Sequence, residues 1–294
     1  MQQIIKGSIV ALITPFHEDG SINFEKLDEI LEWHIANKTD AILILGTSGE
    51  SATTSHEEDA EVVKRTIRTV NGRLPVIVGS GSNSTQTAIE KSKRFEALGA
   101  DQLLVISPYY NKATPLGMTR HFTQVADSVS IPIIMYNVPS RTGVAITEEV
   151  VRELSQHPHI RGIKEASGNI SYTADIARYV NDDFALYSGN DDMITPILSL
   201  GGSGVISVLA NVAPRETHDI VMDYLNGNEK KSLEGQLKYL DLIHALFCEV
   251  NPIPVKEALN LMGKGVGGYR LPLCEMTPEH RARLKAEMEA VGII

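Results

Sequence analysis

The chain has 294 residues, of which 43% are hydrophobic, and its 27 basic and 37 acidic side chains give a formal net charge of −10. This composition is typical of a globular protein and excludes collagen-like and disordered chains, while the acidic balance argues against nucleic acid as a partner. No apolar run approaches the ~20 residues of a membrane span and no signal peptide is apparent, so we expect no membrane association and a cytoplasmic location. Cys248 and Cys274 are too few for a disulfide framework.

Eight short runs rich in Val, Ile and Leu follow one another along the chain, and each precedes a segment with helical spacing. Their nearly continuous apolar character indicates strands buried on both faces, as in a parallel sheet, with crossovers such as the predicted helix 24–37. The predicted strands are residues 8–13, 41–45, 75–78, 102–106, 132–136, 160–164, 184–187 and 204–208.

Polar or glycine-containing clusters follow nearly every predicted strand. In a closed barrel of eight βα units these strand ends meet at one mouth, where catalytic residues lie. The pattern therefore predicts a (β/α)8 TIM barrel over residues 1–228, with an open, doubly wound sheet as the alternative. The strand pattern stops after Asn228, and helices are predicted at 230–249, 254–262 and 278–291. We expect residues 229–294 to form a C-terminal helical region, either a small domain or a lid on the barrel.

Lys164 ends the sixth predicted strand, and its side chain is expected to point into the mouth of the barrel. Burial there disfavours the ammonium form and lowers the pKa, which is what an amine needs to attack a carbonyl and form a Schiff base. The alternative is a lysine that is paired with Glu165 or with another carboxylate at the strand end.

Tyr136 ends the fifth predicted strand. Neighbouring parallel strands lie about 4.8 Å apart, so its hydroxyl is expected within reach of the Lys164 amine. Imine formation moves protons onto and off a carbinolamine oxygen, and a tyrosine can relay them. An amphipathic tyrosine of the barrel wall is an equally good interpretation of this residue alone.

The segment Gly46-Thr47-Ser48-Gly49 combines two glycines, which allow a tight turn, with two hydroxyls beside free backbone amides. Such a loop suits a carboxylate or a phosphate. Arg141 follows the fifth strand and presents donors that fit a carboxylate, although a surface salt bridge is the favoured interpretation of that residue alone. No metal-ligand cluster appears at the strand ends, so we expect no metal site.

Five motifs in chain order point to one family. They are GTSGES at 46–51, PYYN at 108–111, YNVPSRTG at 136–143, GIKEASG at 162–168 and GVISV at 204–208. With these motifs the chain resembles the dihydrodipicolinate synthase family, within the pyruvate-dependent class I aldolases that include N-acetylneuraminate lyase. The likeness runs through the whole barrel and into the helical tail.

The resemblance implies a lyase that condenses pyruvate with L-aspartate 4-semialdehyde, without metal or organic cofactor, to give 4-hydroxy-tetrahydrodipicolinate for lysine and diaminopimelate biosynthesis. Lys164 is then the Schiff-base residue. Tyr136, Thr47 and Tyr110 form a proton relay, with Tyr110 entering from the neighbouring subunit. A homo-oligomer follows, a tetramer built of tight dimers.

The same resemblance implies the substrate contacts. Thr47 and Ser48 hold the carboxylate of pyruvate, Arg141 holds that of the aldehyde substrate, and the backbone at Gly189 and Ile206 lines the pocket. The family's loop usually reads Gly-Thr-Thr-Gly-Glu. Ser48 keeps the hydroxyl and lacks the methyl group, so we expect substrate binding to persist with a slightly looser carboxylate.

Many family members are inhibited by lysine at a subunit interface. Five positions match that allosteric site, namely Ser51, Ala52, His56, Asn83 and Tyr109. Thr87 stands where lysine-sensitive members carry a glutamate for the ligand's ammonium group, and Asp59 replaces a second histidine. We expect weak or absent lysine feedback, although Asp59 offers a carboxylate that can compensate.

Two alternative functions are open at this point. A sibling aldolase acting on sialic acid or a keto-deoxy sugar acid generally needs hydroxyl-binding groups at the position of Arg141, so this arginine argues against it. A barrel that only binds a small keto acid needs no proton relay, and the intact set of Lys164, Tyr136, Thr47 and Tyr110 argues against that reading.

Overall fold

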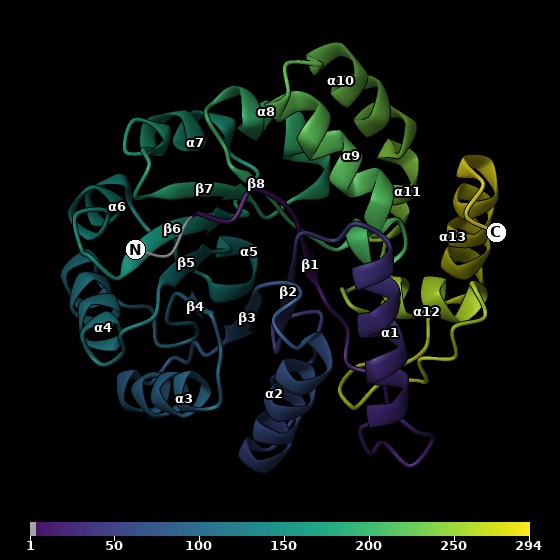
Figure 1. Cartoon of the computed structure of the whole chain (residues 1–294), viewed down its shortest axis with the longest axis horizontal. Coiled ribbons are helices and arrows are strands. Elements are labelled where there is room, and N and C mark those ends of the chain that lie inside the picture. Colours follow the sequence, from purple (N-terminus) through teal and green to yellow (C-terminus); the bar gives the residue numbers. More distant parts are fainter. Residues whose placement is uncertain (1–3) are drawn as a thin grey trace.

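The computed structural model describes residues 4–294 and confirms the barrel. Eight parallel strands pair in chain order, and β8 closes onto β1, which excludes the open sheet (Figure 1). The strands are β1 (Gly7–Ala11), β2 (Ala41–Ile44), β3 (Val76–Gly79), β4 (Gln102–Ile106), β5 (Ile133–Asn137), β6 (Ile160–Glu165), β7 (Ala185–Ser188) and β8 (Gly204–Ser207). Each overlaps one predicted run, with ends that differ by at most two residues.

Helices cover the outside of the barrel. They are α1 (Phe24–Ala36), α2 (His56–Val70), α3 (Thr85–Ala97), α4 (Pro115–Asp127), α6 (Glu148–Leu154), α7 (Ile170–Ala177), α8 (Ile194–Ser199) and α9 (Pro214–Leu225), while the short α5 (Pro139–Thr142), η1 (Asp191–Met193) and η2 (Leu209–Asn211) follow β5, β7 and β8. Local signals define the helix ends. At the start of α2, Ser55 and Glu58 form a reciprocal capping box, and Asn71 ends the helix in the left-handed conformation.

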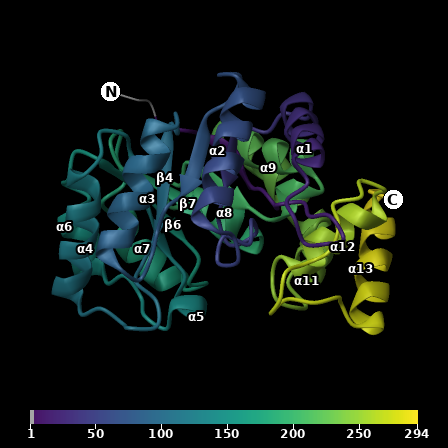
Figure 2. The same ribbon diagram turned by 90° about the horizontal axis from the view of Figure 1, so that it is seen from below.

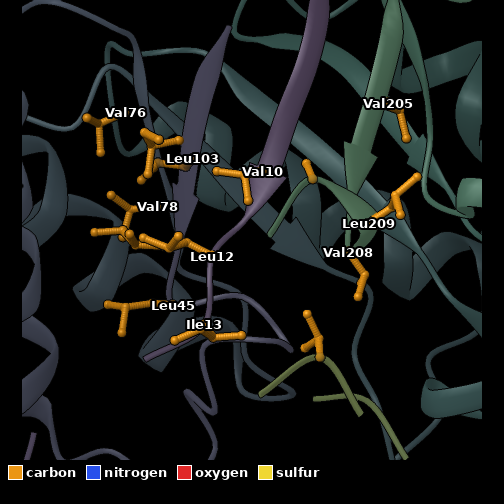
Figure 3. Close-up of a cluster of buried hydrophobic side chains, with 14 of the residues drawn as sticks. Val10, Leu12, Ile13, Leu45, Val76, Val78, Leu103, Val205, Val208 and Leu209 are labelled. Carbon is orange, nitrogen blue, oxygen red and sulfur yellow. The ribbon is translucent and has the colours of Figure 1, made fainter. Parts of the chain in front are cut away.

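The strands separate two apolar layers. Alternate side chains such as Ile9, Leu43 and Leu104 fill the barrel interior. The residues between them, among them Val10 and Leu103, pack outward against the helices (Figure 3). Because both faces are covered, the strands read as continuous apolar runs, which is why their positions were predictable.

The C-terminal region consists of α10 (Glu229–Lys238), α11 (Leu240–Ala245), α12 (Ile253–Leu261) and α13 (Pro278–Val291). Figure 2 shows α11, α12 and α13 grouped at one side of the barrel. The single helix predicted over 230–249 is wrong, because the helix breaks at Tyr239, whose backbone leaves the helical conformation while its side chain is buried. The break lets α10 pack on α9 and α11 pack on α13. The division at residue 228 stays a prediction.

Candidate active site

Lys164 lies near the carboxyl end of β6, in register with Tyr136 of β5 on one side and Tyr187 of β7 on the other. Its side chain lines a cavity, and only 6% of the residue is exposed. The alternative pairing with Glu165 does not occur. The Glu165 carboxylate instead accepts hydrogen bonds from Asn137 Nδ2 at 2.6 Å and from the Ser167 backbone N–H at 2.5 Å.

Burial lowers the pKa of Lys164 to about 8. The negative charge of Asp191 acts in the opposite direction, and the positive charge of Arg141 adds to the lowering. About a tenth of the amine is therefore neutral at pH 7, against less than about one part in a thousand for an ordinary lysine. The site thus supplies a nucleophilic amine near neutral pH.

Tyr136 lies beside this amine. Lys164 Nζ is 4.4 Å from the centroid of the Tyr136 ring, and Thr47 lines the same cavity and acts to lower the pKa of the Tyr136 hydroxyl. Burial raises the pKa of Tyr136, so the phenol keeps its proton at neutral pH and can pass it on. The structure therefore places Lys164 beside two of the three residues of the expected relay, Tyr136 and Thr47.

The cavity at the mouth of the barrel has a volume of about 180 Å³. Six of the expected site residues lie on its wall, namely Thr47, Ser48, Tyr136, Arg141, Lys164 and Gly189. A Cβ atom at Gly189 would lie 2.6 Å from Ala166 Cβ and 3.1 Å from Lys164 Cε, so only glycine fits there.

Two expected residues lie off this wall. Ile206 is buried in the barrel interior below the cavity's lining, with 1% of the residue exposed. Tyr110 lies on the loop after β4, with 90% of the residue exposed, so this chain does not place it next to its own Lys164 cavity.

Asn251, just before α12, was missed by the sequence analysis. Its side-chain Nδ2 donates to Ser48 Oγ at 3.0 Å, and its backbone carbonyl accepts from Arg141 Nη2 at 3.2 Å. It also lines the cavity. An asparagine in the helical tail carries no sequence signal that connects it to a loop about 200 residues earlier.

The acidic pair at 191–192, shortly after the seventh strand, is by its sequence typical of a helix start. The short η1 does begin there, but the Asp191 carboxylate is buried, and its Oδ2 accepts from the backbone N–H groups of Val208 at 3.0 Å and Leu209 at 2.9 Å. Within residues 4–294, Asp191 Oδ1 has no hydrogen-bond partner. Its place after the seventh strand, at the barrel mouth, was the signal that could have identified it.

A second cavity of about 470 Å³ adjoins the first, because Thr47, Tyr136 and Arg141 line both. Four of the five matched allosteric positions lie on its wall, namely Ser51, Ala52, His56 and Tyr109, whereas Asn83 does not. Thr87 and Asp59 also line it.

Asp59 is not free in this second cavity. Its carboxylate accepts from Thr54 Oγ1 at 2.6 Å and pairs with Lys91 Nζ at 3.0 Å. Lys91 lies on the same wall and was missed by the sequence analysis. Asp59 was considered as a substitute for the missing glutamate, but its carboxylate is already paired with Lys91.

A third cavity, of about 1020 Å³, lies at the opposite end of the barrel, next to residues that precede β5 and β6. His157 and His159 line it, and His157 Nε2 is 3.1 Å from Asp127 Oδ1.

Within residues 4–294, no group of three or more His, Cys, Asp or Glu side chains is arranged to hold a metal ion. No helix of that range has the length and apolar character of a membrane span.

Comparisons with known proteins agree with one another. The sequence model of the Dihydrodipicolinate synthetase family matches residues 4–291. A 4-hydroxy-tetrahydrodipicolinate synthase of Caldicellulosiruptor saccharolyticus is 55% identical over 290 residues, which are 99% of this chain and 98% of that protein. The chloride-inhibited dihydrodipicolinate synthase from Acinetobacter baumannii, complexed with pyruvate, superposes with a TM-score of 0.97 at 40% identity, covering 99% of this chain and 100% of that chain. The enzyme from Cyanidioschyzon merolae with lysine bound gives a TM-score of 0.97 at 38% identity, covering both chains fully.

Proposed function

Because the chain belongs to the dihydrodipicolinate synthetase family, we propose that it is a lyase that condenses pyruvate with L-aspartate 4-semialdehyde to give 4-hydroxy-tetrahydrodipicolinate, in lysine and diaminopimelate biosynthesis. The relatives support this synthase reaction rather than that of a sialic acid or sugar-acid aldolase. The observation that carries the proposal is the buried amine of Lys164, beside Tyr136 in the cavity at the barrel mouth.

The first half of the reaction joins pyruvate to Lys164. The neutral amine adds to the ketone carbon, the carbinolamine loses water, and an iminium forms that withdraws electrons from the methyl group. Tyr136, which lines the cavity together with Thr47, passes the protons that leave the nitrogen and reach the departing oxygen. Thr47 and Ser48 hold the carboxylate of pyruvate, and the glycine at 189 lets the backbone lie close against the Lys164 side chain on the cavity wall.

The second half uses the aldehyde substrate. Loss of a methyl proton turns the iminium into an enamine, whose carbon attacks the aldehyde carbon of L-aspartate 4-semialdehyde. Arg141 holds the carboxylate of this substrate through its guanidinium donors. The substrate's own amine then replaces Lys164 at the former ketone carbon, which closes the ring and frees the lysine. The lysine iminium serves as the electron sink, so this route calls for no organic cofactor.

The assembly is a homo-oligomer, a tetramer of tight dimers in which Tyr110 completes the relay of the neighbouring subunit. The position of Tyr110 supports this arrangement, because the residue is 90% exposed on the loop after β4 and is therefore accessible to a neighbouring subunit. The second cavity is the counterpart of the lysine site, with weak or absent inhibition because Thr87 supplies no carboxylate and Lys91 occupies that of Asp59.

Borohydride reduction in the presence of pyruvate tests the proposed function. We expect a covalent pyruvyl label on the peptide that contains Lys164, located by mass spectrometry, and no label in Lys164→Arg. The matched control is Lys112→Arg, an exposed lysine on the loop after β4, which should label like the wild type. Labelling at another lysine, or none, would contradict the proposal. Formation of the condensation product in a coupled assay then tests the second substrate.

A further inference from the structure

A buried ion pair joins the helical tail to the loop that carries Thr47 and Ser48. Lys256 Nζ of α12 lies 2.7 Å from Glu50 Oε1, and the two side chains are 0% and 1% exposed. The ammonium group also lies 4.2 Å from the centroid of the Phe16 ring. Neither residue touches the Lys164 cavity, and the proposed chemistry does not use them.

Stability alone is a poor explanation for this pair. Removal of two charges from water costs about as much as their attraction returns, and an apolar pair of similar volume is often at least as stable. The pair does have a geometric consequence. Both charges are buried, so each is neutralised only when its side chain lies next to the opposite charge of its partner. Each side chain therefore fixes the position of the other.

Glu50 belongs to the turn that forms one wall of the cavity. Its backbone N–H donates to the Thr47 carbonyl at 3.1 Å, and the Gly49 N–H donates to the Gly46 carbonyl at 3.1 Å. Glu50 adopts a φ of 53°, which is uncommon for a residue with a side chain and persists only where the surroundings hold it. Because the turn is tight and strained, a displacement of the Glu50 carboxylate would also displace Thr47.

The same segment of the tail holds the turn at a second point. Asn251, five residues before Lys256, donates from Nδ2 to Ser48 Oγ at 3.0 Å. The contact to Ser48 and the contact to Glu50 therefore both come from one short segment, with Asn251 just before α12 and Lys256 within it.

We propose that Lys256 and Glu50 are positioning residues that fix the turn of residues 46–50, so that Thr47 and Ser48 face the pyruvate carboxylate and Tyr136. The helical tail is then part of the catalytic machinery. This inference rests on the proposed function, since pyruvate is the ligand that the turn holds.

Lys256→Met tests the inference. We expect the KM for pyruvate to rise about tenfold or more and kcat to fall, because displacement of a catalytic group by an ångström has effects of this size or greater. The KM for the aldehyde substrate should change less, because Arg141 lies on α5. The matched control is Lys264→Met, a partly buried lysine of the tail that stacks on the Trp33 ring and contacts no part of the turn. It should lower the Tm and leave both KM values unchanged.

The double variant Glu50→Gln with Lys256→Met separates positioning from stability. It removes both charges, so we expect the Tm to recover relative to Lys256→Met while the KM for pyruvate stays raised. Recovery of the KM together with the Tm would overturn the inference, as would an unchanged KM in either variant. Absence of a pyruvyl label in the wild-type protein contradicts the proposed function instead, so the two failures are distinguishable.

Discussion

The reactivity of Lys164 depends on two charges of opposite sign as well as on burial. Asp191 raises its pKa and Arg141 lowers it, while burial, the largest effect, brings it to about 8. Because only the neutral amine attacks a ketone, we expect both neighbours to control the rate of the proposed imine formation near neutral pH.

The rate of imine formation with pyruvate should rise with pH to a midpoint near 8 and then level off. Removal of the negative charge in Asp191→Asn should move this midpoint to lower pH, because the ammonium form loses a stabilising neighbour. Removal of the positive charge in Arg141→Ala should move it to higher pH. Rapid-quench borohydride trapping at subsaturating pyruvate reports the free protein's midpoint.

Asp192→Asn is the control for these shifts, because Asp192 is the exposed neighbour of Asp191 and its substitution should leave the midpoint unchanged. Shifts of the same sign in Asp191→Asn and Arg141→Ala would contradict the assignment of the two charges.

Helices α2 and α3 supply the charged groups that decide what the second cavity can bind. Asp59 and Lys91 already form an ion pair there, and Thr87 offers a hydroxyl where an ammonium ligand requires a carboxylate. Glu50, the other carboxylate on this wall, is paired with Lys256, so the described residues of the cavity wall offer no free anionic partner for the side chain of lysine.

We expect turnover to be unchanged at millimolar lysine, as measured in steady-state assays at subsaturating pyruvate. Thr87→Glu adds a carboxylate to the cavity wall and should lower the half-inhibitory lysine concentration about tenfold or more, the effect of one added charged hydrogen bond. Gln86→Glu places the same charge on the exposed side of the same turn and should have no effect. Strong inhibition of the wild type would refute this prediction.

The secondary structure was predictable to different degrees in the barrel and in the C-terminal helical region. Strand positions followed from apolar runs, because a strand covered on both faces has little choice of residue. The helix break at Tyr239 was not predictable, because the helical pattern of charges and apolar residues continues through it. The break is decided by packing, since α10 and α11 contact different neighbours.

The whole assembly contributes to the active site if Tyr110 acts across an interface. Lys164→Arg lacks the nucleophile, and Tyr110→Phe lacks the last hydroxyl of the relay. Each variant alone should have little activity. After random exchange of equal amounts, about half of the dimers are mixed. In each mixed dimer one of the two sites combines an intact Lys164 with an intact Tyr110 from the partner, so about a quarter of the wild-type activity should return.

The readout is the coupled assay before and after exchange, with unmixed variants taken through the same treatment. Activity that does not return on mixing would contradict a relay shared between subunits, because a tyrosine that acts within its own chain leaves every mixed site defective.

The amino-acid sequence by itself determined the closed order of eight βα units and the identity of Lys164, Tyr136, Thr47 and Arg141 as one group. The order of the strands and the place of Lys164 and Tyr136 follow from local patterns and from the rule that the carboxyl ends of the barrel strands share one mouth, whereas the inclusion of Thr47 and Arg141 followed from the resemblance to the family. Only the tertiary structure decided that the helical tail reaches this mouth, through Asn251 on Ser48 and Lys256 on Glu50. The physical reason is that such contacts join residues about 200 positions apart, and no periodicity along the chain records a pairing of that kind.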